Sequence, residues 1–190
     1  MRNKNFLLCF FVAFICWLMP FISSFFLDEY REFPVNEIET MNLTEESVVN
    51  TVIEALRKND NKSAFVIIFQ NNLKNCILNI LGGVMLGIGT FINIIFNGFV
   101  TGNVFDSYYN IEQNIDIILK TTLPHSFELI GFWLSGAIGF YIAWLIICFM
   151  RGKENFTPKA CIRIGIYSGI VFLIILSAAY VEAFITSKQL

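Results

Sequence analysis

The chain has 190 residues, of which 56% are hydrophobic, and its mean hydropathy is +0.64. Soluble domains average about 45–50% apolar residues, so this composition is too apolar for an ordinary soluble domain. The formal net charge is −2, which leaves no basic surface of the kind that binds nucleic acid. The length suffices for one helical membrane domain in a lipid bilayer and little more. We therefore expect an all-α, polytopic membrane helix bundle.

Sites for catalysis, cofactors or structural metals are not indicated by the sequence. It contains no GxSxG, no phosphate-binding glycine loop, no CxxC and only one histidine, so no triad can be assembled. The cysteines all lie in or beside apolar segments, which argues against a disulfide framework. We predict a protein that is not an enzyme and that has no cofactor. The five cysteines are Cys9, Cys16, Cys76, Cys148 and Cys161.

The first segment, residues 1–26, contains an apolar run from Phe6 to Phe26 that follows Arg2 and Lys4. The run is longer than the apolar region of a signal peptide and lacks an A-x-A-like cleavage site. It predicts a retained first transmembrane helix with a cytoplasmic N-terminus.

Residues 27–62 form an acidic segment with nine acidic and four basic residues, expected outside the cytoplasm. Apolar residues recur at helical spacing after Thr44, a residue type that suits an N-cap. The pattern predicts a short amphipathic helix on the outer membrane face, which either packs onto the membrane helices or serves as a docking site. The apolar residues of this helix are Val48, Val49, Val52, Ile53 and Leu56.

Residues 63–190 are expected to form a membrane domain of about four helices. The 42 residues from 64 to 105 are long enough for two crossings, near 64–83 and 85–105, although polar residues interrupt them at 70–75. A broken or re-entrant helix is the alternative. Clearer spans follow at 127–150 and 164–185.

The basic loop between these last two spans determines the number of crossings. It carries Arg151, Lys153, Lys159 and Arg163 against Glu154, so the positive-inside rule places it in the cytoplasm. A chain that starts inside must cross an even number of times before it reaches this loop. The prediction is five spans, with the 106–122 loop and the C-terminus outside.

Small residues and asparagines predict close contacts between these helices. Small residues let membrane helices approach closely, and buried amides hydrogen-bond across them. A four-residue stripe in the fourth span therefore predicts a compact bundle, with a homo-oligomer or a heteromeric contact along any unused stripe. The stripe consists of Gly131, Ser135, Gly139 and Ala143; the other small pairs are Gly83/Gly87, Gly98/Gly102 and Gly165/Gly169. The pairs Asn75/Asn79 and Asn93/Asn97 share helix faces and either fix the helix order or line a path.

A polar cluster, residues 123–128, stands at the start of the fourth span. Pro124 suits the first turn of a helix, and His125 and Glu128 are three residues apart, so their side chains can meet. Glu182 is expected on the same side of the membrane. The cluster either caps the helix or supports proton-coupled transport, because histidine titrates near neutral pH. A metal site is not indicated, since the spacing matches no known ligand motif.

Several motifs, in this order, resemble the stage II sporulation protein M family of bacterial membrane proteins. They are FQNN at 69–72, GIGT at 87–90, NG at 97–98 and LPHSFEL at 123–129. Ser126 departs from the glycine that the family tends to have after the histidine. The candidate site residues are Asn71, Asn72, Asn97, Gly98, Pro124, His125, Glu128 and Glu182.

The resemblance implies a multi-pass protein of the bacterial cytoplasmic membrane without catalytic activity. In spore formers it implies a scaffold that recruits peptidoglycan-degrading partners, such as wall hydrolases, during engulfment of the forespore. The alternative is a subunit for bacteriocin maturation, export or self-immunity that works with an ABC-type ATPase. The expected surroundings are the lipid bilayer and other membrane or extracytoplasmic proteins.

Overall fold

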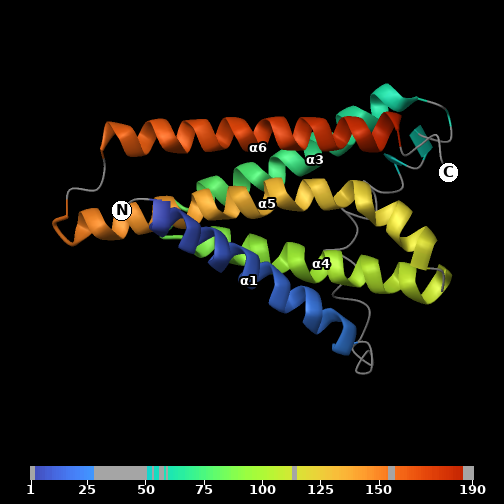
Figure 1. Cartoon of the computed structure of the whole chain (residues 1–190), viewed down its shortest axis with the longest axis horizontal. Helices are drawn as coiled ribbons and strands as arrows, with labels where there is room; N and C mark the ends of the chain where they lie inside the picture. Colours follow the sequence, from blue (N-terminus) through green and yellow to red (C-terminus); the bar gives the residue numbers. More distant parts are fainter. Residues whose placement is uncertain are drawn as a thin grey trace.

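The computed structural model describes residues 3–27, 51–52, 54–55, 58, 60–112, 115–153 and 157–185. The side chains of residues 3, 104 and 106–126 lie outside this described part. Five long helices make up the fold, and the described residues contain no strand (Figure 1). The predicted all-α helix bundle is confirmed. The helices are α1 (Asn3–Leu27), α3 (Asn61–Gly82), α4 (Ile88–Glu112), α5 (Ile115–Met150) and α6 (Pro158–Phe184).

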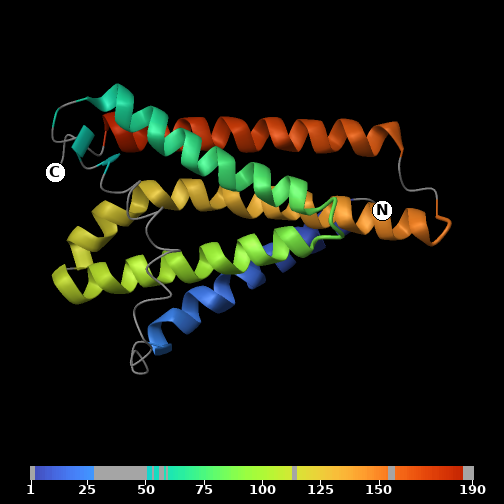
Figure 2. The same ribbon diagram turned by 180° about the vertical axis from the view of Figure 1, so that it is seen from behind.

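Consecutive helices run in opposite directions, and Figures 1 and 2 show this from two sides. Helices α1, α4 and α6 run one way, and α3 and α5 run the other. The beginning of α1, the α3–α4 turn and the loop between α5 and α6 therefore lie at one end of the bundle. This is the arrangement that the five-span prediction requires, because it puts the N-terminus and the basic loop together.

Four of the five helices are long and apolar enough to cross a membrane. They contain the candidate spans Lys4–Phe26, Asn61–Gly82, Phe127–Met150 and Pro158–Phe184. At 1.5 Å per residue, even the 22 residues of α3 extend about 33 Å, which matches the hydrocarbon thickness of a bilayer. Helix α4 corresponds to the predicted third span and lies antiparallel to α3. The segment 64–105 thus forms two separate helices rather than one broken helix.

The predicted loop at 106–122 is wrong, because these residues belong to two helices. Helix α4 continues to Glu112, and α5 begins at Ile115. This stretch contains no glycine or proline, so nothing in it interrupts a helix. Helix α5 consequently extends well beyond the predicted 127–150.

Pro124 is therefore inside α5 and not in its first turn, and the same correction applies to Glu128. Proline inside a helix removes one backbone hydrogen bond and commonly bends the helix. Figure 1 shows α5 changing direction in the part that contains Pro124. At the other end, α6 starts at Pro158, six residues before the predicted 164. Thr157 caps it by accepting a hydrogen bond from Ala160 N at 3.3 Å.

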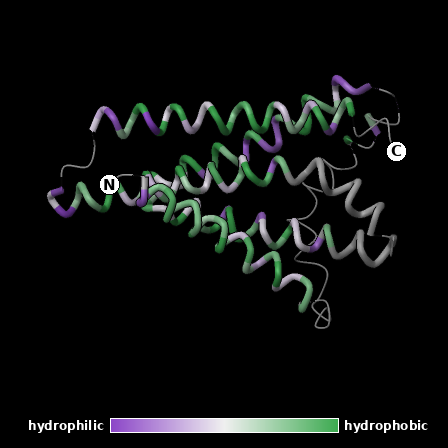
Figure 3. The backbone as a smooth tube through the Cα atoms, viewed as in Figure 1, coloured by the Kyte–Doolittle hydropathy of each residue, from purple (hydrophilic) through white to green (hydrophobic). Residues whose placement is uncertain are grey.

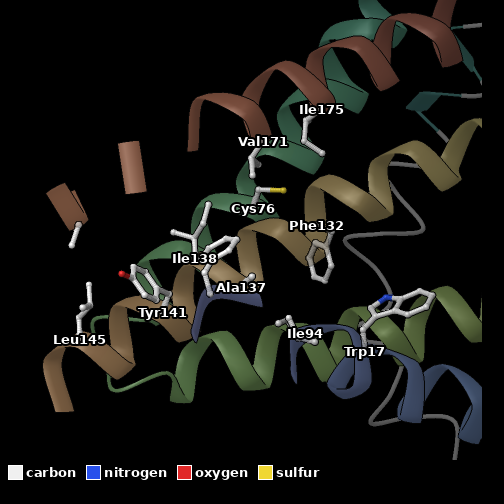
Figure 4. Close-up of a cluster of buried hydrophobic side chains, with 13 residues drawn as sticks. Trp17, Cys76, Ile94, Phe132, Ala137, Ile138, Tyr141, Leu145, Val171 and Ile175 are labelled. Atoms are coloured by element: carbon white, nitrogen blue, oxygen red, sulfur yellow. The ribbon is translucent and has the colours of Figure 1, made fainter. Parts of the chain in front are cut away.

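Helix α5 occupies the centre of the bundle and contacts α1, α3, α4 and α6. In its candidate span, 56% of the residues are buried, against at most 22% in the other three spans. Side chains from all five helices meet in one core cluster (Figure 4). The labelled members include Trp17 of α1, Cys76 of α3, Ile94 of α4, Tyr141 of α5 and Ile175 of α6.

Most of the predicted amphipathic helix lies outside the described residues. Its described residues, 51–52 and 54–55, are helical. Ala55 is buried in a second cluster with Ala64 and Ile68 of α3 and Ala179 and Ala183 of α6. This part of the segment packs onto the membrane helices, as one of the two predicted alternatives requires.

Candidate functional site

A buried polar network joins α3, α4 and α5 in the middle of the bundle. Asn79, Thr90 and Ser135 are each 0% exposed. Asn79 Nδ2 donates to Ser135 Oγ at 2.9 Å, and Ser135 Oγ donates to Phe132 O at 2.7 Å. Thr90 Oγ1 donates to Asn79 O at 2.7 Å. Each helix of this contact therefore contributes a side chain that satisfies a polar group of a neighbour.

Asn93 of α4 completes the network. Its Nδ2 donates to Asn79 Oδ1 at 2.8 Å and to Asn75 O at 3.1 Å. Three of the four predicted asparagines thus meet at the α3–α4 contact. Asn97 lies one turn further along α4, where its backbone oxygen accepts a hydrogen bond from Thr101 Oγ1 at 2.7 Å. The contacts favour the interpretation of these amides as groups that fix the helix order.

Thr90 belongs to this network although the sequence analysis did not single it out. It lies three residues before Asn93, so both side chains share one face of α4. That spacing was a usable signal in the sequence. Ser135 was predicted as a small packing residue, and it is also a hydrogen-bond partner.

The small-residue stripe of α5 packs entirely inside the chain. A Cβ at Gly139 would overlap the backbone oxygen of Asn79, and a Cβ at Gly83 would overlap the backbone oxygen of Gly139. A Cβ at Gly131 would lie 2.9 Å from Ile175 Cδ1 of α6. Ala143 faces Gly87 in the α3–α4 turn. The stripe explains the compact bundle and leaves no free surface for another protein.

The NG motif has a packing role at the α1–α4 contact. A Cβ at Gly98 would overlap the backbone oxygen of Trp17, and a Cβ at Gly102 would overlap Ser24 Oγ. Both glycines are buried. In contrast, Gly165 and Gly169 of α6 have no atom within 4 Å of the position that a Cβ would take.

The polar cluster at 123–128 lies only partly in the described region. The side chains of Pro124 and His125 are outside it. Glu128 of α5 and Glu182 of α6 are half-buried, and each has one carboxylate oxygen that is fully buried. These two carboxylates therefore face protein rather than lipid, as is usual for charged groups in membrane helices.

Helix register places Glu128 and Glu182 toward the same end of the bundle. Gly131 of α5 packs against Ile174 and Ile175 of the antiparallel α6. Moving back along α5 from Gly131 and forward along α6 from Ile175 leads to the same end, where α6 finishes (Figure 1). The structure thus agrees with the prediction that Glu182 emerges on the side of the polar cluster.

Two other predicted residues, Asn71 and Asn72, are half-buried in α3. They lie on the N-terminal side of the network formed by Asn75 and Asn79. Among the described side chains, no three histidine, cysteine or acidic groups cluster in a way that could hold a metal ion.

Hydrophilic residues gather near the helix ends, whereas the middle of the described bundle is largely apolar (Figure 3). This distribution fits a bundle whose middle is surrounded by lipid. The polar network is the main exception, and its amide and hydroxyl groups are hydrogen-bonded internally.

Comparisons with known proteins agree with this architecture. The family model for stage II sporulation protein M matches residues 6–187. An uncharacterized protein of Methanocaldococcus jannaschii is 32% identical over 127 residues, which cover 65% of this chain and 71% of that protein. No solved structure matches the chain. The chain belongs to the stage II sporulation protein M family.

Proposed function

We propose that this protein is a non-enzymatic scaffold that holds partner proteins at the bacterial cytoplasmic membrane. Family membership and the closely packed helical bundle support this proposal. In a spore former, the proposed partners are components of the peptidoglycan-remodelling complex that acts during forespore engulfment. The observation that carries the proposal is the outer face of α6.

The outer face of α6, defined here as Ile162, Gly165, Ile166, Gly169 and Ile170, is exposed and has small residues one turn apart. Every other glycine within the five helices meets atoms of a neighbouring helix or turn of this chain. In lipid, such small residues let a second helix approach closely enough for van der Waals packing. The proposed partner is therefore a membrane helix of another protein, and the contact lies on α6 instead of the α5 stripe.

The alternative role in bacteriocin export or immunity would use the asparagines and the 123–128 cluster. Asn75, Asn79 and Asn93 are engaged in the α3–α4 contact, so they support helix packing. The scaffold is the function that the described contacts favour.

A partner-recovery experiment tests the scaffold proposal. The tagged full chain is purified from native membranes in mild detergent, and bound proteins are quantified by mass spectrometry. Gly165→Leu with Gly169→Leu should reduce the recovery of specific membrane partners at least about tenfold, because leucine blocks close helix approach. Thermal unfolding should stay unchanged, since neither glycine contacts the bundle.

The matched control is Val12→Phe with Ile15→Phe, which adds bulk to the exposed face of α1. This variant should recover the same partners as the wild type. Equal recovery with the α6 variant would contradict the proposed contact. Recovery of wall hydrolases would support the engulfment role, whereas recovery of an ABC-type ATPase would overturn it in favour of export.

A further inference from the structure

A groove of about 460 Å³ opens between α1 and α6 near the end of the bundle where α1 begins. Its lining consists of Lys4, Phe6, Leu7, Phe10 and Tyr167. The Phe6 and Tyr167 rings lie 4.3 Å apart across it. The volume is within the range of about 300–1,000 Å³ that is usual for ligand pockets in proteins.

The polarity of the groove changes along α1. Lys4 lies nearest the end of the bundle, and Leu7 and Phe10 follow at intervals of three residues, so all three share one face of the helix. Lys4 and Leu7 are exposed. A cationic group at the end and apolar groups toward the middle match the order of headgroup and acyl chain in a membrane lipid.

Arg163 supplies a second cation on the opposite wall. It precedes Tyr167 by one turn of α6, so the two side chains share a face of that helix. Its Nη1 is buried and has no hydrogen-bond partner among the described residues. A buried guanidinium N–H without a partner is costly, and the planar guanidinium fits phosphate oxygens well. An anionic phosphate group is the ligand type that would complete this arrangement.

The charge of this end of the bundle favours the same ligand. Its described residues include five bases and no acid: Lys4, Arg151, Lys153, Lys159 and Arg163. Basic pockets between membrane helices attract anionic lipid headgroups. We propose that the α1–α6 groove binds one anionic phospholipid, with the phosphate between Lys4 and Arg163 and an acyl chain along Leu7 and Phe10.

Native mass spectrometry of the full chain in detergent tests the headgroup contact. Phosphatidylglycerol and phosphatidylcholine with identical acyl chains are titrated, and the Kd of each is measured. Lys4→Gln with Arg163→Gln should weaken phosphatidylglycerol binding about tenfold, because two attractive charges are lost. Phosphatidylcholine binding should be unchanged.

The matched control is Lys153→Gln with Lys159→Gln, which removes the same charge from the same end but outside the groove. Its affinity for phosphatidylglycerol should stay within about twofold of the wild-type value, because these side chains do not line the site. Equal loss in both variants would show general surface attraction and overturn the site. Equal affinity of the wild type for both lipids would also overturn it.

A second comparison tests the acyl-chain contact. Leu7→Trp fills the groove, whereas Leu8→Trp places the same ring on an exposed neighbour that does not line it. We expect the first variant alone to lose phosphatidylglycerol binding. Glycerol phosphate, which has the anionic headgroup but no chains, should not displace the lipid; displacement would indicate a site for free phosphate and contradict the proposal. These outcomes do not depend on the scaffold role.

Discussion

Asn79 connects three helices through its side chain and its backbone. The amide donates to Ser135 of α5 and accepts from Asn93 of α4, and the backbone oxygen accepts from Thr90. In lipid no water competes for these groups, yet the unfolded helices can also find partners, so each bond contributes about 0.6–2 kcal/mol. Asn79 is therefore a stabilising residue whose loss should be measurable.

Replacing Asn79 with leucine should lower the stability of the bundle by about 1–3 kcal/mol, because two side-chain hydrogen bonds are lost. The bond from Thr90 goes to the backbone and should remain. Thermal unfolding of the purified chain, followed by tryptophan fluorescence, should show a decrease in Tm of about 3–10 °C. Gln70→Leu, at an exposed position of the same helix, is the control and should not lower Tm. An unchanged Tm for Asn79→Leu would show that the network does not stabilise the fold.

The residues of the polar network illustrate what sequence can and cannot predict at this scale. The four-residue spacing of Asn75 and Asn79 correctly indicated a shared face. It could not indicate that Ser135 and Thr90 bond to Asn79, because these contacts depend on the order and register of α3, α4 and α5. The side chains of Pro124 and His125 lie outside the described residues, so their proposed interactions stay predictions.

Helix α5 brings the other helices together through small residues. Gly139 is the closest point, because a side chain there would collide with the backbone of Asn79 and with Thr90. The neighbouring backbones cannot move aside without disturbing the polar network. The contact therefore depends on the absence of a Cβ.

Gly139→Ala should consequently destabilise the bundle, whereas Gly165→Ala should not. Alanine has a higher helix propensity than glycine by about 1 kcal/mol, so the second variant should be neutral or slightly stabilising. The first variant should lower Tm by several degrees despite the same gain, because its methyl group overlaps α3 and α4. Thermal unfolding of both variants under identical detergent conditions measures the difference. Similar Tm values would contradict the close contact.

At the level of elements, the hydropathy pattern predicted that five helices exist but misplaced several of their ends. Helix α5 continues through 115–126 because amphipathic or polar residues can extend a helix beyond the hydrocarbon region. Composition alone does not mark where lipid ends if no glycine or proline interrupts the helix. Pro124 suggested a helix start, since proline favours the first turn, but it is also tolerated within long membrane helices.

The whole molecule combines an internally packed core with two distinct outward surfaces on α6. The face around Gly165 and Gly169 is proposed to contact partner helices, and the face around Arg163 and Tyr167 borders the lipid groove. A scaffold of this kind could hold a partner while its other helices stay surrounded by lipid. Sequence motifs indicated the family correctly, but the free and occupied small-residue pairs could be distinguished only after the helices were placed.

The topology also belongs to this scale, because it depends on the direction of every helix. The alternating helices put Lys153 at the end where α1 begins and Lys62 at the opposite end (Figure 1). The cluster of basic residues near Lys153 assigns that end to the cytoplasm. Both lysines are exposed, so each can be replaced by a reporter cysteine.

The most direct test of the bundle's placement in the membrane uses cysteine labelling in intact cells. The five native cysteines, which are all free, are first replaced, and Lys62→Cys or Lys153→Cys is then introduced. A membrane-impermeant maleimide should label Cys at position 62 in intact cells and at position 153 only after permeabilisation. Labelling of both positions in intact cells, or of position 153 alone, would contradict the alternating five-helix arrangement across the bilayer.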